Sequence, residues 1–449
     1  MVWELSCIPR PRGKPSVSAV DVGWWERFRM PVAGGSNTQQ TRSIKIVRIL
    51  ARLNIGGPAI HAVLLTEGLN DDTARSILVT GKIGSAEGDM LYFARQHGVT
   101  PVVIPELGRK ISWRDDLVAL WKLYRLLAKE RPDVVHTHTA KAGSLGRLAA
   151  ILAGVPVRIH TFHGHVFHGY FGRLTTKLFI VIERIMALFT TRIVAISEAQ
   201  RFDLLCRYRI ASAEKFSVIP LGLDLTSFLG NETRTTPMPS ATGSVATLGF
   251  VGRLVPVKNP CMALNVLAKL ARNPLVPRVR LVMVGDGALR TLLQEQVCRL
   301  GLETQVVFTG WKRDLAGVYA DMDLIVMTSV NEGTPVVLIE AMAAGRPFIA
   351  TRVGGVVDLV VGTETVFRGE TGQPLFSVFA NGILTESDDE EGFAAAVAFL
   401  LQDRELMKKM GREGRNFVKV RFSKERLVRD ISALYRESLA GRAASSEAL

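Results

Sequence analysis

From residue 43 onward, short runs of hydrophobic residues alternate with longer stretches in which hydrophobic positions recur every three or four residues. The runs IKIVRIL, SILVT, PVVIP, DVVHTH, VRIHTF, RIVAIS and FSVIP predict strands, and segments such as DDLVALWKLYRLLAKE and SLGRLAAILAG predict helices between them. Strands that alternate with helices in this way are typical of a parallel sheet that is covered on both faces.

A polar, turn-rich stretch at 224–244 interrupts this alternation, which restarts with TLGFVG and continues to the end of the chain. We therefore predict an α/β protein with two tandem Rossmann-like, doubly wound parallel-sheet domains that face each other across a cleft. The first domain is expected at 43–223 and the second at 245–423, with 224–244 as the linker. In such sheets ligands bind in the loops at the carboxyl ends of the strands.

The first 42 residues show little periodicity and many Pro, Gly and Ser residues, which predicts a poorly ordered N-terminal extension. Three tryptophans (Trp3, Trp24 and Trp25) leave open that this extension docks onto a surface.

The net charge of +14 and the pI of about 9.9 favour anionic partners, such as anionic lipid headgroups, phosphorylated substrates or nucleic acid. No run interleaves basic and aromatic residues as an RNA-binding sheet does, so we do not expect nucleic acid. The four cysteines are scattered without a CxxC pair, which argues against a disulfide framework and against a zinc-thiolate site. A reducing compartment fits this pattern.

No signal peptide is recognisable, and the most apolar run, LFIVIERIMALF at 178–189, is interrupted by Glu183 and Arg184. We therefore predict a cytoplasmic protein, with peripheral contact to the inner face of the plasma membrane as a further candidate location. The surrounding stretch is basic and apolar by turns, which suits either an amphipathic helix at a membrane or a buried core helix.

Two of the strand-end loops have residues that suit phosphate groups. Gly56 and Gly57 lie between a predicted strand and a helix, where small residues let a phosphate approach backbone N–H groups, although a tight turn is the alternative. Arg253 and Lys258 follow the strand TLGFV, and two cations there could hold a diphosphate or be ordinary solvated side chains. In a third loop, Gly285 and Asp286 suit either backbone proximity to a ligand or a simple turn.

The stretch NEGTPVVLIEAMAAGRPFIA at 331–350 is the most informative. Its helix is predicted over 336–344, so Thr334, Pro335 and Val336 lie at the helix start, where an anion gains from free N–H groups and the helix dipole. Glu332 and Glu340 flank this anion site, and carboxylates there make sense if they accept hydrogen bonds from hydroxyl groups. A ligand with both phosphates and hydroxyls is a nucleotide sugar; the alternative is a plain amphipathic helix with two surface glutamates.

Histidines gather in HTFHGHVFH at 160–168, after two more in VVHTH. No cysteine or carboxylate lies close in sequence to complete a metal site, so we predict none. His160 is expected to be a core residue on the strand, whereas His163 falls at its carboxyl end. His165 and His168 are expected to line an acceptor channel or to lie on a surface loop.

Together these motifs resemble the retaining glycosyltransferases of family 4, which have the two-domain GT-B fold. The resemblance covers about 43–440. It is carried by GG at 56–57, HTFHG at 160–164, AISE at 195–198, IPLGLD at 219–224, GRLVPVKN at 252–259, GDG at 285–287, FTG at 308–310 and the glutamate pair of 332–340. HTHTAKAGSLGRLAA resembles bacterial enzymes of capsule, O-antigen and exopolysaccharide assembly.

The resemblance implies a role for each motif. Arg253 and Lys258 would neutralise the diphosphate of a nucleotide-diphosphate sugar, Glu340 would accept from its ribose, and Glu332 and His163 would contact its sugar. Gly57 would lie against the diphosphate or the sugar. No tightly bound cofactor or metal is implied, and the acceptor would be a polyprenyl-diphosphate-linked or other glycan. The last helix, at about 424–440, would cross back to the first domain.

Two departures limit what the resemblance carries over. Thr334 and Pro335 replace a bulky residue that often follows Glu-Gly in the family, which changes the pocket near the sugar. The connection near 361–380 is lengthened and has no assigned place. A sugar-nucleotide 2-epimerase of the same architecture and a non-catalytic sugar-nucleotide-binding scaffold remain as alternative functions.

Overall fold

The computed structural model describes residues 43–83, 88–108, 112–164, 172–230 and 245–447. The predicted extension at 1–42, most of the predicted linker, and His165 and His168 lie outside these ranges. Within the described residues no helix is both long enough and apolar enough to cross a membrane.

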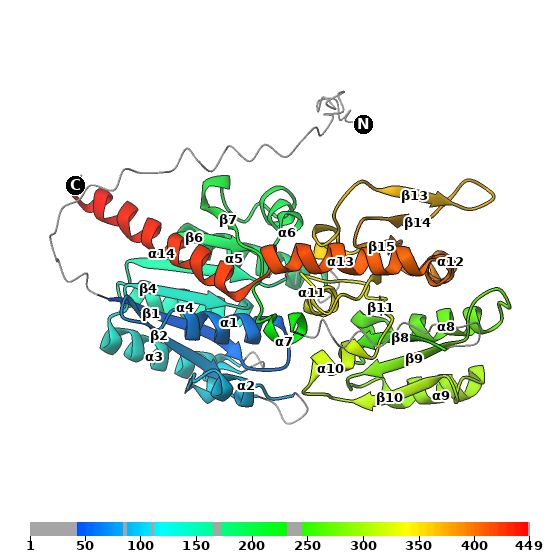
Figure 1. Cartoon of the computed structure of the whole chain (residues 1–449). Coiled ribbons are helices and arrows are strands. Elements are labelled where there is room, and N and C mark those ends of the chain that lie inside the picture. The colour runs from blue at the N-terminus through cyan, green and yellow to red at the C-terminus, as the bar shows by residue number, and fades with distance from the viewer. Residues whose placement is uncertain (1–42, 84–87, 109–111, 165–171, 231–244, 448–449) are drawn as a thin grey trace, which may run out of the picture. The chain divides into compact units, whose positions relative to one another are not determined.

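The first sheet has seven parallel strands in the order β3-β2-β1-β4-β5-β6-β7 (Figure 1). The strands are β1 (Ile44–Arg52), β2 (Ala74–Gly81), β3 (Val102–Val103), β4 (Val134–His138), β5 (Val157–Phe162), β6 (Arg192–Ala195) and β7 (Phe216–Val218). The order reverses between β1 and β4, and at such a switch point the loops after the two strands diverge and leave a crevice.

Helices cover both faces of this sheet. They are α1 (Gly57–Gly68), α2 (Leu91–Gln96), α3 (Trp113–Glu130), α4 (Ala140–Leu152), α5 (Arg173–Leu188), α6 (Glu198–Phe202) and α14 (Lys424–Glu447). The short helix α7 (Thr226–Leu229) follows this sheet and packs with the core of the second domain. Val47 packs with α3 and α4, whereas its neighbour Ile46 packs with α1 and α14 on the opposite face. Because both faces are buried, β1 reads as an almost continuous apolar run. The contacts of α14 with α1 and β5 confirm that the last helix crosses back to the first sheet.

The second sheet has eight strands in the order β10-β9-β8-β11-β12-β15-β14-β13. The strands are β8 (Ala246–Val251), β9 (Val279–Val284), β10 (Val306–Gly310), β11 (Leu324–Met327), β12 (Phe348–Thr351), β13 (Thr365–Arg368), β14 (Pro374–Val378) and β15 (Gly382–Thr385). The accompanying helices are α8 (Pro260–Ala271), α9 (Arg290–Leu300), α10 (Leu315–Ala320), α11 (Val336–Ala343), α12 (Glu390–Gln402) and α13 (Arg404–Arg421).

The lengthened segment near 361–380, which has no place in the sequence-based prediction, forms the hairpin β13–β14 at one edge of the second sheet. Both strands are antiparallel to their neighbours, so this sheet is not parallel throughout. Phe367 and Phe376 stack across the hairpin with ring centroids 4.8 Å apart, and Phe376 is buried in the core of the second domain. The insertion therefore extends the sheet rather than forming a loop over the site.

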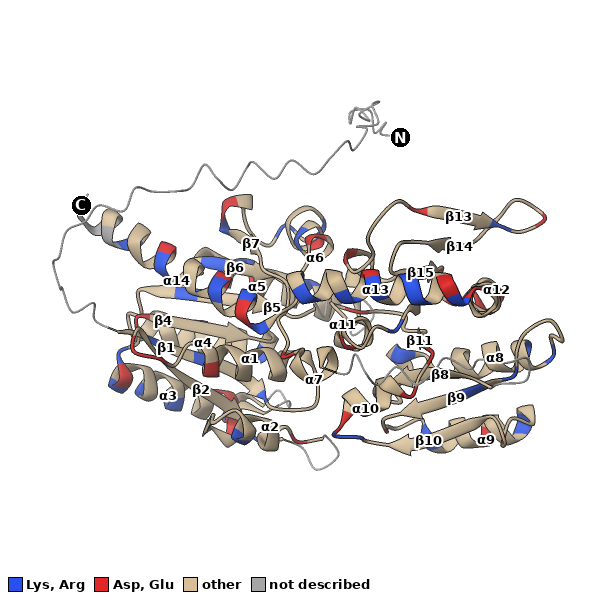
Figure 2. Cartoon of the chain, in the orientation of Figure 1, with Lys and Arg blue, Asp and Glu red and all other residues tan. Residues whose placement is uncertain are grey.

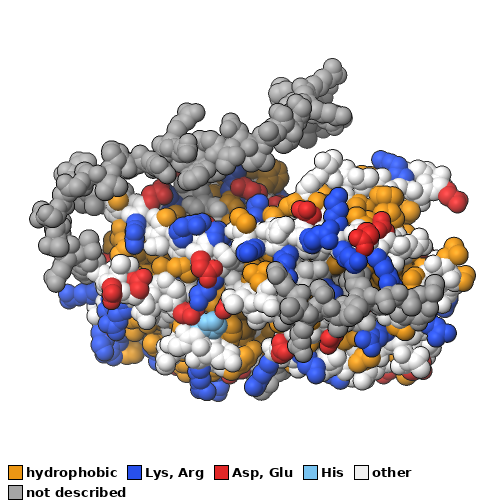
Figure 3. Space-filling model, in the orientation of Figure 1, with side chains coloured by type: hydrophobic (Ala, Val, Ile, Leu, Met, Phe, Trp, Pro, Cys, Tyr) orange, Lys and Arg blue, Asp and Glu red, His pale blue; other side chains and the backbone are white. Residues whose placement is uncertain are grey.

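Two crossings of the chain between the sheets run side by side. The N–H of Leu223 donates to Phe422 (2.8 Å), and the N–H of Lys424 donates back to Leu223 (3.0 Å). Part of the predicted linker is helical, because α7 lies within it, and Phe228 of α7 packs edge-on against Tyr319 of α10. Basic and acidic residues are interspersed along α13 and α14 (Figure 2), and the face drawn in Figure 3 mixes hydrophobic and charged side chains.

Candidate active site

The loop after β1 meets the start of α11. Gly56 has a φ of 154°, a conformation that suits glycine, and it caps α1 without a side chain. A side-chain carbon at Gly57 would lie 3.1 Å from Cγ2 of Val336, the first residue of α11. Similarly, a side-chain carbon at Gly333 would lie 2.8 Å from the carbonyl oxygen of His163. Glycines thus allow the backbones of the two sheet regions to approach closely where the predicted site residues gather.

Lys258 and Glu332 form an ion pair at the ends of two neighbouring strands. Lys258 ends a short turn after β8, Glu332 follows β11, and Lys258 Nζ lies 2.5 Å from Glu332 Oε1. The hydroxyl of Ser329 donates to the same oxygen at 2.6 Å. The side chain of Glu332 is 10% exposed, and the ammonium group of Lys258 balances its nearly buried charge.

Arg253 also follows β8, but its side chain is exposed and has no ion pair or hydrogen bond with the described residues. The guanidinium therefore retains all its donors for an anion in solution.

The geometry of the turn after β9 explains why Gly285 and Asp286 occupy it. Gly285 has a φ of +129°, and a side chain there would collide with the carbonyl oxygen of Gly252. The carboxylate of Asp286 accepts from the N–H of Gly287 (2.8 Å) and from Arg290 (2.9 Å), which are the bonds of a turn residue that also holds the start of α9. The loops after β8, β9 and β10 pack together here, since Gly285 also donates to Gly310 (2.9 Å).

The start of α11 is built as the sequence predicts, except that Pro335 precedes the first helical turn as its N-cap. Thr334 is buried, and its hydroxyl has no hydrogen-bond partner among the described residues. Glu340 is only 8% exposed, so the alternative of two surface glutamates is wrong. Burial raises the pKa of Glu340 to about 7, although the hydroxyl of Tyr319, which donates to it at 2.9 Å, acts in the opposite direction.

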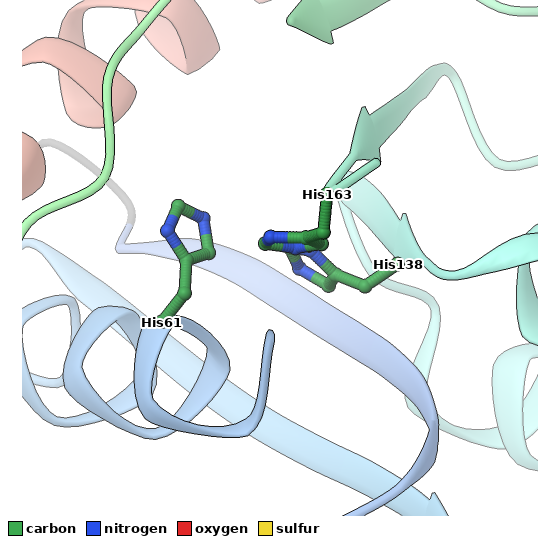
Figure 4. A group of neighbouring side chains, drawn as sticks. All are labelled: His61, His138 and His163. Carbon is green, nitrogen blue, oxygen red and sulfur yellow. The ribbon is translucent and has the colours of Figure 1, made fainter. Parts of the chain in front are cut away.

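Three histidines from the first sheet region converge beside the β1 and β5 loops (Figure 4). His61 comes from α1, His138 from the end of β4 and His163 from the loop after β5. His138 Nδ1 and His163 Nε2 are 2.9 Å apart, and one ring nitrogen from each histidine lies within 4.8 Å of the other two. Both ring nitrogens of His61 are buried without a partner among the described residues.

These histidines are neutral near neutral pH. Burial is the main cause that lowers the pKa of His61 and His138 well below its ordinary value, and it lowers the pKa of His163 to about 3. Neighbouring histidines and Arg48 lower the pKa of His61 further. A neutral imidazole has one N–H donor and one acceptor nitrogen, a combination that matches a hydroxyl group.

A buried hydrogen-bond network lies behind the histidines and includes the last helix. Arg48 Nη2 donates to the hydroxyl of Tyr435 in α14 (3.1 Å), and that hydroxyl lies 2.6 Å from His136 Nδ1. Arginine can only donate, so Tyr435 accepts from Arg48. His136 Nε2 lies 2.7 Å from Thr161 Oγ1, so both ring nitrogens of His136 have a hydroxyl partner.

The structure brings most of the predicted site residues together, and it adds others. Gly57 approaches Val336 and His163 approaches Gly333 across the two sheet regions, and Glu332 pairs with Lys258, whereas Asp286 is engaged in its own turn. Residues that the sequence-based prediction missed are Ser329, Tyr319, His61 and His138. A signal for His138 was present, since it ends a strand beside the one that leads to His163.

Comparison with known proteins identifies the family. Residues 55–227 match the family Glycosyltransferase Family 4, and residues 241–417 match Glycosyl transferases group 1. Over 336 residues the chain is 30% identical to the Escherichia coli UDP-Gal:alpha-D-GlcNAc-diphosphoundecaprenol alpha-1,3-galactosyltransferase. This match covers 74% of this chain and 82% of the Escherichia coli protein. The chain belongs to glycosyltransferase family 4. It is also 27% identical to the capsular polysaccharide glycosyltransferase CapM of Staphylococcus aureus over 342 residues, 74% of this chain and 84% of CapM.

Solved structures confirm the fold of this family 4 glycosyltransferase. Anabaena HepE in complex with UDP superposes with a TM-score of 0.69 at 21% identity and covers 88% of this chain and 100% of HepE. Sucrose-phosphate synthase from Thermosynechococcus elongatus superposes with a TM-score of 0.71 at 20% identity and covers 88% of this chain and 100% of that structure. The predicted GT-B fold is thereby confirmed.

Proposed function

We propose that this glycosyltransferase moves a sugar from a nucleoside-diphosphate sugar to a polyprenyl-diphosphate-linked glycan, with retention of anomeric configuration, in the assembly of a cell-surface polysaccharide. The observation that carries the proposal is the enclosed meeting point of Lys258, Glu332 and the start of α11 opposite the loop of Gly57. Cationic and backbone donors there suit a diphosphate, and the carboxylates beside them suit hydroxyl groups.

The residues proposed to bind the nucleoside-diphosphate sugar are assigned from their charges. A departing nucleoside diphosphate has two to three negative charges, and each close cation is worth about 4 kcal/mol of Coulomb energy at an effective dielectric constant near 20. Lys258 and the exposed Arg253 supply such cations, and the N–H groups at the start of α11 add the helix dipole. In this proposal Glu340 accepts from the ribose, and His163 and Glu332 contact the transferred sugar.

Retention is supported by the state of Glu332 and His163, the two side chains proposed to contact the transferred sugar. An inverting transfer needs a side chain that removes the acceptor proton, with a pKa near the working pH. The carboxylate of Glu332 is held by Lys258 and Ser329, and the imidazole of His163 has a pKa of about 3. We therefore assign the proton to the leaving phosphate, which departs from the same face that the acceptor attacks.

The acceptor is assigned from the relatives. The similar Escherichia coli enzyme is named for a diphosphoundecaprenol-linked acceptor, and CapM is named for capsular polysaccharide biosynthesis. In this proposal the chain meets its acceptor at a membrane surface, because a diphosphoundecaprenol-linked sugar is held there by its lipid.

The experiment incubates the purified full chain with UDP-galactose, UDP-glucose or their N-acetyl forms, together with a synthetic polyprenyl-diphosphate-linked sugar. We expect one donor to give an elongated lipid-linked product whose new linkage has the anomeric configuration of the donor, as read by NMR. An inverted linkage would overturn retention. Release of nucleotide and a rearranged free sugar without any acceptor would instead identify an epimerase. Glu332→Gln serves as the matched inactive control.

A further inference from the structure

Helix α5 has a stripe of hydrophobic side chains that faces solvent. The exposed residues of the stripe are Leu174, Leu178, Val181, Ile185 and Leu188. Their spacing of three or four residues places them within about 80° of the helix circumference. Leu174 is 83% exposed and Leu188 is 73% exposed, so the stripe runs the length of the helix. The alternative of a buried core helix therefore does not hold for this side of α5.

Helix α3 has a second stripe, which is richer in aromatic residues. Its exposed residues are Trp113, Leu117, Trp121 and Tyr124. They also fall within about 80° of the helix circumference. The guanidinium groups of Arg114 and Arg125 lie over the rings of Trp113 and Trp121, 5.0 and 4.9 Å from their centroids. Each tryptophan thus presents an apolar ring beside a cation.

Both stripes lie in one layer of helices. Helix α4 contacts α3 on one side and α5 on the other, and α3 and α4 share a core cluster against the first sheet. Leu152, at the end of α4, is 58% exposed between them. We call these exposed residues of α3, α4 and α5 the α3–α5 face.

The basic and acidic side chains of α5 lie on different sides of the helix. Lys177 and Arg184 are exposed and lie within about 40° of the edge of the apolar stripe. The one acid of the helix, Glu183, lies on the opposite side, where it is buried and paired with Arg147 at 2.6 Å. The exposed side of α5 is consequently apolar with a cationic border and lacks an acid.

We propose that the α3–α5 face docks onto an anionic lipid bilayer. Its apolar side chains would enter the boundary between headgroups and acyl chains, and its lysine and arginine side chains would meet the lipid phosphates. Tryptophan, tyrosine and snorkelling cations around an apolar centre are the residues that favour this interface. Docking of this face would give the proposed function a lipid surface on which to meet its acceptor.

The test is co-sedimentation of the full chain with vesicles, without donor or acceptor. We expect the protein to sediment with vesicles of equal parts phosphatidylglycerol and phosphatidylethanolamine, and much less with phosphatidylcholine. The double variant Leu178→Gln/Ile185→Gln should bind at least roughly tenfold more weakly, because it loses two buried apolar side chains. Lys177→Gln should weaken binding about fivefold, and added salt should remove this difference.

Matched controls replace exposed apolar residues of the second domain, Leu292→Gln on α9 and Val420→Gln on α13, and should leave vesicle binding unchanged. Circular dichroism of each variant verifies folding. Equal binding of the α5 double variant and the wild-type chain would overturn the proposal. So would a concentration-dependent dimer that the double variant abolishes while the wild-type chain ignores vesicles. A chain that binds vesicles yet transfers no sugar would contradict the proposed function and leave this surface assigned.

Discussion

The ammonium group of Lys258 lies 2.5 Å from the carboxylate of Glu332, so each of these two proposed donor-binding residues neutralises the other before any donor is bound. In the proposed function, a diphosphate that enters the site would compete with Glu332 for the lysine. Glu332 would then be released toward the sugar hydroxyls, while Ser329 still donates to it. The pair would thereby link occupation of the phosphate site to the position of the carboxylate beside the sugar.

We predict opposite effects of the two single substitutions on nucleotide binding. Lys258→Ala should weaken binding of the nucleoside diphosphate and reduce turnover on the order of a hundredfold, because a preorganised cation is lost. Glu332→Gln should leave binding equal or tighter, since the lysine no longer has to leave a carboxylate, yet turnover should fall at least as far. Titration calorimetry and a turnover assay separate the two; weaker nucleotide binding in Glu332→Gln would contradict this relationship.

The buried carboxyl group of Glu340 predicts a pH dependence of nucleotide binding. Its pKa of about 7 is raised by burial, so the group gains a proton as the pH falls below neutrality. If the ribose donates to the ionised carboxylate, binding requires loss of that proton. Affinity should then fall with decreasing pH below about 7, by up to about tenfold per pH unit. Isothermal titration calorimetry from about pH 8 to about pH 6 measures this change in nucleotide affinity.

Two variants isolate this effect from titration of the phosphate itself. Glu340→Gln cannot ionise and should retain only the pH dependence that comes from the ligand. Tyr319→Phe removes the hydroxyl that donates to Glu340, so the pKa of Glu340 should rise further and the loss of affinity should begin at a higher pH. Identical pH profiles for the wild-type chain and Glu340→Gln would remove Glu340 from the nucleotide site.

The histidine group allows a direct test of the prediction that no metal is needed. We expect transfer to persist after treatment with EDTA, because Lys258, Arg253 and the start of α11 already supply positive charge to the diphosphate. Ring nitrogens of His61, His138 and His163 lie within 4.8 Å of one another, an arrangement of three imidazoles that also suits Zn²⁺ with one open position. Loss of activity on chelation, restored by Zn²⁺ in the wild-type chain but not in His61→Ala, would make them metal ligands.

The order of strands and helices was predictable because both sheets are buried on both faces, which makes strands such as β1 and β8 mainly apolar runs. The hairpin β13–β14 was not, because Phe367 and Phe376 are separated by glycine and charged residues and show no clear period in the sequence. Helix α5 was ambiguous for a physical reason: a stripe of aliphatic residues three or four positions apart looks the same in the sequence whether it faces a core or a membrane.

In the site, residues at strand ends were predictable from position, as for Lys258, Glu332 and His163. The residues that were missed act from elsewhere in the chain. Tyr319 reaches Glu340 from a different helix, and Tyr435 reaches His136 across 299 positions of sequence. No local pattern encodes such pairs, because each forms only when separate elements pack together, as when the last helix brings Tyr435 back onto the first sheet.

That packing gives the last prediction. Tyr435→Phe removes the hydroxyl that joins Arg48 to His136, which leaves two buried polar groups without their shared partner. The substitution should lower the free energy of unfolding by about 1–3 kcal/mol, measured from the urea midpoint of the full chain. Tyr124→Phe, on the exposed side of α3, should change it by less than about 0.5 kcal/mol. Since the rings of His136 and His138 lie 4.3 Å apart, Tyr435→Phe should also reduce turnover. Wild-type stability in this variant would show that the network does not help to hold α14 on the first sheet.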